Sequence, residues 1–490
     1  MNNFPSAIFP SAINLADIQG LIINGYTHPN SAHMIFQFGA DSQPADFIRA
    51  IYSHVQTAAP WGPVKPANML NIALTATGIN ILKGFNIDPL ASKFDLTFCS
   101  GPASIGSQGS LQDNGPSDPS NWLFGNNTPQ PVSDYKQIPV ECMVHVYGLT
   151  IPDLSALVKT VANAAAAADL TEIFPITPGK RLEQCHLPPG NIHFGYRDGI
   201  DNPSLDPSVS KMPFRNSDPQ NLNNFLVGYH NDKSYFSPGP IGNSDEAKFA
   251  NNGFYNAFRM LSQDLEGFDQ FLSDHAAVVA PQIGKDVAFA TDWLAAKLVG
   301  RWKNGSALEL WPDAPEHDPT PDSLKKGFGY SGDMSGLKCP ITAHTRVANP
   351  RDATMTSGNS PIPRVLRRGV PYGPTADDPE YKNGQSGLVG MFLVGNLSSE
   401  FEVVSGWMNR NNFTPPLAAR YPNTQDALLA NRQVGTTTQE FPIPLSIVTP
   451  ATNPPTVNIT PAPILPQFIT TRGSAYTFFP SMSALKSCFS

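Results

Sequence analysis

The chain carries few charged residues and no concentration of positive charge. Charged side chains make up 15% of its 490 residues and the formal net charge is −8, whereas soluble domains average roughly one quarter charged residues. A chain without a basic stripe cannot neutralise a phosphate backbone, which argues against nucleic acid as a partner. Small organic substrates or cations fit this charge balance better.

Cysteine is scarce and long apolar runs are missing. The five cysteines are far apart and contain no Cys-x-x-Cys pair, which argues against a disulfide framework and against a structural zinc site. No run is long enough to span a bilayer, and the first residues lack the basic and apolar regions of an export signal. Because sequons are nevertheless present, both a secreted and a cytoplasmic location stay open. The sequons begin at Asn126, Asn304, Asn396, Asn412 and Asn458.

Proline and glycine, in contrast, are abundant. The 49 prolines and 38 glycines predict long ordered loops around the regular elements. The length exceeds the usual size of one compact core, so we expect two. In the first half the expected order is strand, strand, helix, strand, helix, strand, and a similar arrangement recurs in the second half. We therefore predict an α+β fold of two related units, residues 1–210 and 211–490, with helices packed on antiparallel sheets.

Apolar periodicity predicts the individual elements. In the first unit, alternation predicts strands at 33–38, 69–74 and 141–147, and five consecutive alanines favour a helix at 151–170. A further strand is predicted at 21–23, and the proline-rich residues 442–466 are interpreted as an ordered arm. The second unit is predicted to hold strands at 225–229, 254–260, 390–394 and 471–480 and helices at 264–279, 292–298 and 401–408.

One histidine stands in an apolar stretch with arginines on its C-terminal side. His344 lies among small and β-branched residues, Arg351 follows a turn at Asn349-Pro350, and Arg367 comes sixteen residues later. An imidazole in such a setting can ligate iron, and guanidinium groups can hold carboxylates or developing negative charge. For His344 alone, a hydrogen-bonded core histidine is the favoured interpretation.

A second cluster of interest surrounds Asp198. This residue stands between glycines in the segment 194–203, Phe-Gly-Tyr-Arg-Asp-Gly-Ile-Asp-Asn-Pro. The glycines permit a tight turn from which the carboxylate can project into a cavity. An aspartate between glycines is more often a turn residue bonded to local backbone. A catalytic role for Asp198 is favoured only when His344 and Arg367 are considered with it.

Together these three residues supply what peroxide chemistry on a haem requires. Cleavage of bound hydrogen peroxide needs a group that moves a proton from the inner to the outer oxygen. It also needs a cation that stabilises the charge that builds as the O–O bond breaks. Asp198 can perform the first task and Arg367 the second, with His344 as the axial ligand.

With these residues in view, the sequence resembles the dye-decolorizing peroxidases, in particular fungal ones. The Gly-x-x-Asp-Gly signature matches residues 195–199, the proximal histidine segment matches 344–351, and the distal arginine segment matches 367–373. The resemblance covers nearly the whole chain in the family's order. It implies heme b, two ferredoxin-like domains of the dimeric α+β barrel type, and a peroxidase that oxidises dyes and phenols with hydrogen peroxide, usually best at acidic pH.

The resemblance also implies roles for individual residues. Asp198 would be the distal acid–base residue, Arg367 the distal arginine, and His344 the ligand of the haem iron. These residues would promote heterolysis of peroxide and formation of a ferryl intermediate. Cys339, five residues before His344, is the weaker candidate for an iron ligand because Pro340 follows it directly.

Further roles concern the surroundings of the haem. Arg351 would pair with a haem propionate, because a guanidinium fits a carboxylate in bidentate fashion. Met391 and Leu393 would line the distal face and restrict access to small oxidants. For the carboxylate that bonds the proximal imidazole, Glu402 and Glu400 are only guesses from the sequence.

Large dyes do not fit a peroxide-sized cavity, so electron transfer through a side chain is a plausible route for them. Tyr372 is the candidate relay, although a core aromatic is an equally good interpretation. Trp302 and Trp407 are weaker candidates. The sequence leaves Mn²⁺ open as a further reductant, because hard oxygen ligands leave no spacing signature.

Two functional classes follow from the sequence. The first is a haem peroxidase, and the second is a haem-binding or haem-handling protein of the same fold without peroxidase turnover. A carrier has no need for a distal acid and cation, so the presence of Asp198 and Arg367 favours the peroxidase. The oligomeric state does not follow from the sequence.

Overall fold

A computed structural model of the chain describes most of its residues. The predicted boundary at residues 210 and 211, and the sequon at Asn412, lie outside the described part. The boundary therefore stays a prediction. The described residues are 13–23, 25–127, 136–188, 190–203, 205–206, 220–229, 239–352, 363–379, 381–410, 424–432, 439–447 and 456–490.

The first half of the chain forms one βαββαβ unit. Strand β1 (Asn30–Phe38) leads into helix α1 (Pro44–Ile51) and strand β2 (Asn68–Leu74), and β3 (Cys142–Gly148) leads into α5 (Ile151–Ala167) and β4 (Leu170–Ile173). The four strands lie in the order β4-β1-β3-β2, and all their pairings are antiparallel. This is the strand order of a ferredoxin-like unit, as predicted.

The second half repeats the arrangement. Strand β8 (Phe254–Gln263) is followed by helices α7 (Leu265–Ile283) and α8 (Val287–Val299). Strands β10 (Val370–Tyr372) and β11 (Gly387–Val394) come next. After helix α11 (Val403–Arg410), β14 (Ile469–Phe479) is the last strand of the sheet. The spatial order is β10-β11-β8-β14, so first, second, third and fourth strand occupy the same relative places as in the first unit.

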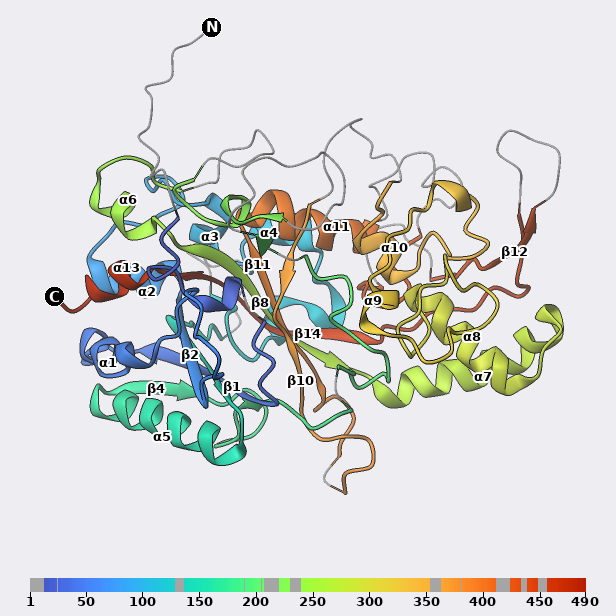
Figure 1. Cartoon of the computed structure of the whole chain (residues 1–490), viewed down its shortest axis with the longest axis horizontal. Helices are drawn as coiled ribbons and strands as arrows, with labels where there is room; N and C mark the ends of the chain where they lie inside the picture. The colour runs from blue at the N-terminus through green and yellow to red at the C-terminus, as the bar shows by residue number, and fades with distance from the viewer. Residues whose placement is uncertain are drawn as a thin grey trace, which may run out of the picture.

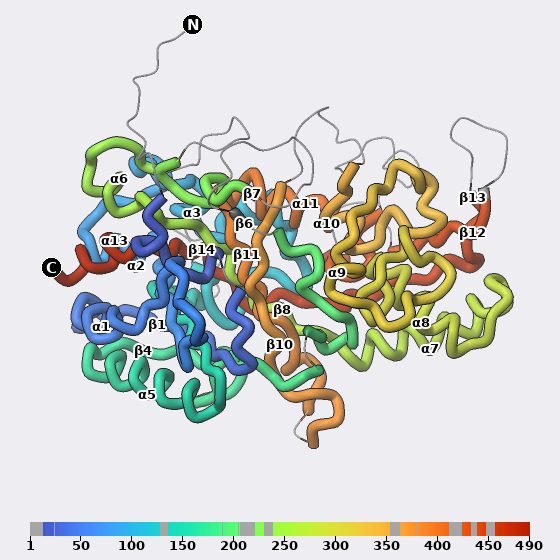
Figure 2. Tube along the Cα trace, in the orientation of Figure 1, coloured from blue at the N-terminus to red at the C-terminus, as the bar shows by residue number. Residues whose placement is uncertain are grey.

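The two units join edge to edge into one open sheet. Phe478 of β14 pairs with Leu74 of β2, and the result is a ten-stranded antiparallel sheet. The described strands do not close into a barrel. Figure 1 shows helices α1 and α5 beside the first unit and α7 and α8 at the opposite end of the molecule. Figure 2 shows β14 and β8, far apart in sequence, running together through the middle.

Alternating side chains give the sheet two buried faces. Phe36 of β1, Val144 of β3 and Tyr476 of β14 lie in the core under the helices. Ile35 and Met143, one residue away, lie in a second core on the opposite face, to which Ile18, Leu21, Tyr26 and the turns around Leu226 also contribute. A strand with both faces buried shows little polar alternation, which is why these strands are apolar almost throughout.

Local signals explain several helix ends. Thr150 caps α5, and a capping box joins its side chain to that of Asp153, an arrangement that satisfies the first free amide groups of a helix. Gly84 and Gly284 end α2 (Ala76–Lys83) and α7 in the left-handed conformation, which glycine adopts without cost from a Cβ atom.

The other elements are short. Within the described residues, no helix has the length and apolarity needed to cross a membrane. The remaining helices are α3 (Leu96–Ser100), α4 (Ile105–Leu111), α6 (Asp245–Ala250), α9 (Pro321–Leu324), α10 (His344–Ala348), α11 (Val403–Arg410) and α13 (Met482–Lys486). The remaining strands are β5 (Leu182–Glu183), β6 (Leu205–Asp206), β7 (Gln220–Asn221), β9 (Leu366–Arg367), β12 (Pro444–Ile447) and β13 (Thr456–Asn458).

Three predicted elements differ from the structure. The strand expected at 21–23 is a 3₁₀ turn, η1 (Gly20–Ile22), and the strand expected at 225–229 is a turn after the 3₁₀ helix η5 (Leu222–Phe225). The helix expected at 401–408 begins as a π-helical turn, η7 (Leu397–Glu402), before α11. Short apolar runs carry no period, so sequence alone does not separate a buried turn from a buried strand.

Candidate active site

A cavity opens on the helix-covered face of the second unit. Residues of the Asp198 loop, α10, β9, β11, α11, β8 and the segment 424–432 line it. Its lining is largely aliphatic and aromatic, which is typical of small-molecule and cofactor sites. The apolar lining residues include Leu111, Ile192, Leu261, Val299, Val365, Leu388, Phe392, Phe401, Val404, Met408, Leu428 and Ile469.

The three residues predicted to act together line this one cavity. Asp198, His344 and Arg367 come from three separate segments of the chain and all contribute to its wall. Asp198 Oδ1 and Arg367 Nη2 are 3.8 Å apart, with side chains 46% and 38% exposed. A carboxylate and a guanidinium at this distance are close enough to contact one small ligand together, and both are accessible to water.

Glycines shape the loop that carries Asp198. Gly195 and Gly199 have φ angles of +84° and +75°, a region that side chains with a Cβ atom rarely adopt. Between them the backbone amide of Asp198 donates to the carbonyl of Gly190 at 2.6 Å, and that of Arg197 donates to Lys303 at 3.0 Å. The loop is thus fastened by its backbone, which leaves the carboxylate to face the cavity.

Asn202 fastens the same loop to the strand of Arg367. Its side-chain amide nitrogen donates to the carbonyl of Arg367 at 2.8 Å, and its Oδ1 accepts from the Arg367 amide at 2.9 Å. On its other side Arg367 pairs with Phe392 of β11. Asn202 therefore ties the loop that carries the Asp198 carboxylate to the strand that carries the Arg367 guanidinium.

His344 begins α10 and contacts a buried carboxylate. Its Nδ1 lies 2.8 Å from Oδ2 of Asp426, a residue with no exposed side-chain surface. The other oxygen, Oδ1, accepts the amides of Leu428 and Leu429 at 2.8 and 2.7 Å. Since the Nδ1–H group of His344 donates to this carboxylate, the lone pair of Nε2 is left for a ligand in the cavity.

The sequence guesses for this partner were wrong. Glu402 accepts the hydroxyl of Tyr476 at 2.7 Å, and Glu400 accepts the amide of Gly395 at 3.0 Å. Neither glutamate bonds His344. Asp426 lies 82 positions after the histidine, and no motif in the sequence marks that pairing.

Arg351 does not line the cavity. It pairs with Asp201 at 3.0 Å and stacks on the ring of Phe328, with its guanidinium carbon 3.9 Å from the ring centroid. Burial acts to raise the pKa of Asp201, but the guanidiniums of Arg351 and Arg364 outweigh it and lower that pKa. Arg364, unlike Arg351, is part of the cavity wall. The propionate role of Arg351 stays a prediction.

The strand β11 presents the opposite face from the one predicted. Met391 and Leu393 are fully buried in the core on the far side of the sheet, and the cavity is lined by Leu388 and Phe392 instead. The prediction was therefore wrong by one residue, which in a strand reverses every side chain. A side chain at Gly390 would meet the Phe392 ring at 2.5 Å, so Phe392 covers that glycine.

Tyr372, the predicted relay, is a core residue. Its side chain is fully buried on the far side of the sheet and lies outside the cavity wall. Its carbonyl accepts from His193 Nε2 at 2.8 Å, and its hydroxyl has no hydrogen-bond partner within the described residues. Burial raises the pKa of this hydroxyl. Trp302 and Trp407 are also buried.

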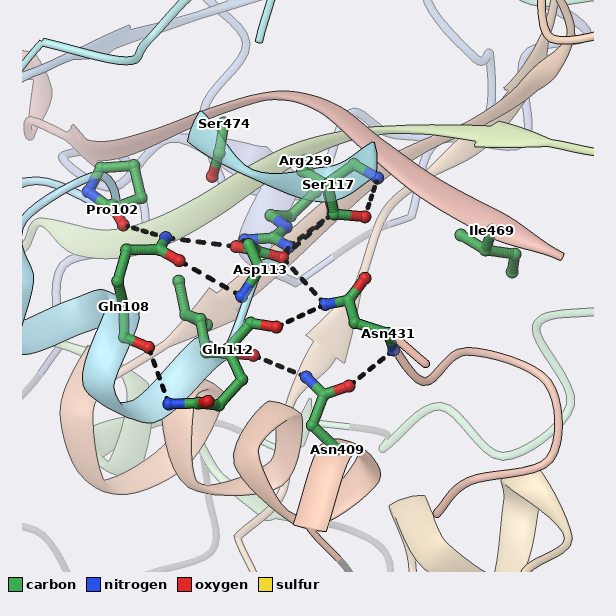
Figure 3. Close-up of polar contacts among 12 residues, drawn as sticks. Pro102, Gln108, Gln112, Asp113, Ser117, Arg259, Asn409, Asn431, Ile469 and Ser474 are labelled. Atoms are coloured by element: carbon green, nitrogen blue, oxygen red, sulfur yellow. Dashed lines mark hydrogen bonds and ion pairs between the residues drawn. The ribbon is translucent and has the colours of Figure 1, made fainter. Parts of the chain in front are cut away.

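The sequence reasoning missed a buried ion pair at one end of the cavity (Figure 3). Arg259 of β8 contacts both carboxylate oxygens of Asp113, at 2.8 and 2.5 Å, and also donates to Thr471 at 2.7 Å. Asn431 extends the network, because its side chain donates to the carbonyl of Gln112 at 2.8 Å. These groups are satisfied among themselves, so they form a rigid polar wall.

Among the residues that the structure describes, no group of three or more histidine, cysteine or acidic side chains is placed to hold a metal ion. All five cysteines are free thiols. Cys339 is buried and lies outside the cavity wall.

The chain is an α+β protein whose candidate active site is a largely apolar cavity, and comparison with known proteins narrows the class of protein. No protein-family model matches the chain. It is 26% identical to a dye-decolorizing peroxidase of Mycetinis scorodonius, covering 99% of this chain and 89% of that protein. It is 24% identical to a dye-decolorizing peroxidase of Auricularia auricula-judae, covering 98% and 88%.

Solved structures agree with the curated relatives. A fungal DyP-type peroxidase from Auricularia auricula-judae superimposes with a TM-score of 0.74 at 22% identity, covering 98% of this chain and all of that one. An ancestral D-type dye-decolorizing peroxidase gives 0.75 at 22% identity with the same coverage. The predicted resemblance to the dye-decolorizing peroxidases is confirmed over nearly the whole chain, and this similarity supports a peroxidase oxidoreductase.

Proposed function

We propose that the chain is a haem peroxidase that uses hydrogen peroxide to oxidise dyes and phenols, with heme b as its cofactor. The observation that carries the proposal is the convergence of Asp198, Arg367 and His344 on one cavity. A solved relative of the same fold was crystallised with 2,6-dimethoxyphenol, which supports phenols as one substrate class.

The cavity residues fit a haem. His344 offers an imidazole whose Nδ1 is already held by Asp426, the arrangement that metal-bound histidines need for a fixed tautomer. The aliphatic and aromatic lining suits the macrocycle, and Arg364 is one of several arginines on the wall whose guanidinium could bind a propionate. When bound, the haem supplies an iron that accepts the oxidising equivalents of peroxide.

Asp198 transfers the proton, and Arg367 stabilises the developing charge. Asp198 accepts the proton of the inner peroxide oxygen and returns it to the outer oxygen, which leaves as water. Arg367 holds its positive charge beside the same oxygens and stabilises the negative charge that develops as they separate. Asp426 keeps the Nδ1 proton of His344 in place throughout. A haem carrier would need none of the distal groups, so the 3.8 Å carboxylate–guanidinium spacing favours the peroxidase.

Rapid mixing with hydrogen peroxide tests this assignment. Asp198→Asn and Arg367→Leu should each slow the reaction by at least about 100-fold, the scale of a lost acid–base group, with the Soret band retained. His344→Ala should lose the Soret band. Asp245→Asn, at an exposed carboxylate 83% accessible on α6, is the control and should match wild type. A wild-type rate in Asp198→Asn contradicts the proposed role.

The reductant range is tested by steady-state turnover. We expect activity with a phenol and with an anthraquinone dye, each measured from acidic to neutral pH. Mn²⁺ is assayed alongside as a proposed further reductant. The absence of turnover with all three, in protein that holds haem, would support the haem-handling alternative.

A further inference from the structure

Two histidines face each other in the core on the far side of the sheet, away from the candidate active site. His33 of β1 lies opposite His145 of β3 in the strand register. By strand alternation their side chains share the face of Ile35 and Met143, which belong to the far-side core. The two histidines are 2% and 0% exposed, and their Nδ1 atoms are 2.9 Å apart. The imidazoles are therefore hydrogen-bonded to each other in an apolar surrounding.

The contact between the Nδ1 atoms fixes how many protons the pair holds. In the neutral pair one imidazole donates its Nδ1–H group and the other accepts with a bare Nδ1. The donor ring then has a bare Nε2 and the acceptor ring an Nε2–H group, and neither Nε2 has a hydrogen-bond partner within the described residues. One extra proton makes the pair a buried cation. A second proton breaks the Nδ1 contact, because both nitrogens then carry hydrogen.

A proton on this pair would meet no compensating carboxylate in the part of the chain that the structure describes. Burial lowers the pKa of His33 to about 3, and burial together with the neighbouring His33 lowers the pKa of His145. The titratable group that faces the pair is Tyr147, with its ring centroid 6.2 Å from that of His33. Burial raises the pKa of Tyr147, which keeps it neutral. Tyr26 and the cation Arg368 lie behind Tyr147, and neither supplies a negative charge.

Aromatic rings of the second unit cover the pair. Phe258 of β8 has its ring centroid 5.9 Å from that of His145 and 6.2 Å from that of His33. Phe479 of β14 lies 5.6 Å from His145, and β2 places the uncharged Asn71 opposite the same residue. The face of a phenyl ring attracts a cation less strongly than bulk water solvates it. A charge on the pair would therefore act against the packing of the two units on this face.

We propose that the His33–His145 pair is an acid-sensitive switch between the two units. While both imidazoles are neutral, their hydrogen bond and the rings around them keep the far-side core closed. Proton uptake on acidification opens this core locally, because a charged pair is more stable in water than between phenyl rings. The pair lies on the opposite face of the sheet from the cavity that His344 lines. The switch therefore does not depend on the proposed peroxidase function.

The sign of the pH dependence follows from the two states of the chain. In the unfolded chain each histidine takes up a proton near pH 6.5, whereas in the folded chain both stay neutral to lower pH. The stabilisation by the neutral pair is therefore complete above pH 6.5 and is lost as the pH falls from 6.5 toward 3. In this range the equilibrium constant for unfolding should rise by up to about tenfold per histidine for each pH unit of acidification.

Urea unfolding of the full chain from about pH 8 to about pH 4 tests the switch. The double variant His33→Phe/His145→Phe keeps ring side chains in the core and removes both titrating groups, so it should lose this acid dependence. His54→Phe, at an exposed histidine, is the matched control and should keep it. Glu141, whose raised pKa gives the opposite sign, is present in all three proteins and cancels in the comparison. Equal acid dependence in wild type and the double variant overturns the proposal.

A second measurement needs no variant and so does not depend on the folding of the double variant. Hydrogen–deuterium exchange at the imidazole Cε1 atom, followed by mass spectrometry, gives the titration of each histidine in the wild type. His33 and His145 should both titrate well below the exposed His54. Titration of either buried histidine at the ordinary value near 6.5 overturns the proposal, because the folded and unfolded chains would then bind equal numbers of protons there.

Local opening is measured by amide hydrogen exchange, corrected for the intrinsic effect of pH on the exchange rate. Between about pH 7 and about pH 4, protection in β1, β3 and β8 of the wild type should fall at least tenfold. Protection in α7, at the other end of the molecule (Figure 1), should stay unchanged. An equal loss in α7 would show global unfolding and overturn a local switch, and unchanged protection in all four elements would overturn it as well.

Discussion

At the residue scale, the contact between His344 and Asp426 decides how the imidazole faces the cavity. The buried carboxylate accepts from Nδ1 at 2.8 Å and is itself held by two backbone amides. The sequence could identify His344 because its segment has a recognisable pattern. It could not identify Asp426, because nothing local distinguishes a carboxylate that meets a histidine across 82 positions.

Replacement of Asp426 tests this contact. Asp426→Asn removes the negative charge that fixes the imidazole, and loss of such a partner typically weakens metal affinity about 10–100-fold. We expect haem to transfer to apomyoglobin at a correspondingly higher rate, measured from the Soret band. Asp322→Asn, at an exposed site on α9, is the control. An unchanged transfer rate in Asp426→Asn would show that the contact does not support the ligand.

A second residue-scale prediction concerns pH and Glu141. Burial raises the pKa of this carboxyl from 4.5 to about 7, although the Phe38 amide that donates to it lowers the pKa in part. The folded state then holds a proton that the unfolded state releases above pH 4.5. The free energy of unfolding should therefore fall as pH rises from 4.5 through 7, by at most about 3 kcal/mol. Glu141→Gln should remove this component in urea titrations, and an unchanged slope would contradict it.

At the element scale, strand β11 shows what alternation can and cannot predict. The run Gly390 to Val394 was correctly interpreted as a buried strand. Both faces of the strand are apolar, because one contacts the core on the far side and the other the cavity. Without polar residues to mark one face, the sequence could not tell Met391 and Leu393 from Leu388 and Phe392.

The hydrogen bonds between the Asp198 loop and β9 are predicted to contribute to both stability and the rate of the peroxide reaction. Asn202→Ala leaves the amide and carbonyl of Arg367 without their side-chain partners. We expect a loss of about 1–3 kcal/mol in unfolding free energy and a peroxide reaction slowed about tenfold or more, since small displacements of positioned groups are costly. Asn383→Ala, at an exposed asparagine bonded to Asp264, is the control. If Asn202→Ala had the unfolding free energy and the peroxide reaction rate of the wild type, Asn202 would have no role in positioning Asp198 and Arg367.

At the scale of the whole molecule, the two ferredoxin-like units share one core. The repeated strand–helix order predicted the α+β class and the two units. The junction of β14 with β2 could not be predicted, because it joins residues about 400 positions apart with no pattern of their own. The core under the helices contains Phe94 and Phe98 from the first unit together with Tyr255 and Phe478 from the second.

This shared core predicts that the two units unfold together. Phe478 is fully buried, with its ring 5.6 Å from Phe94 and 5.2 Å from Tyr255. Phe478→Ala should therefore cost about 3–5 kcal/mol and lower hydrogen-exchange protection in β1 as well as in β8. Leu90→Ala, at a side chain 95% exposed, should change stability by less than about 0.5 kcal/mol. Two results would instead show that the units are independent domains: loss of protection in β8 alone, or two separate transitions in the urea unfolding of the wild type. The reason is that independent cores would transmit no destabilisation across the β14–β2 junction.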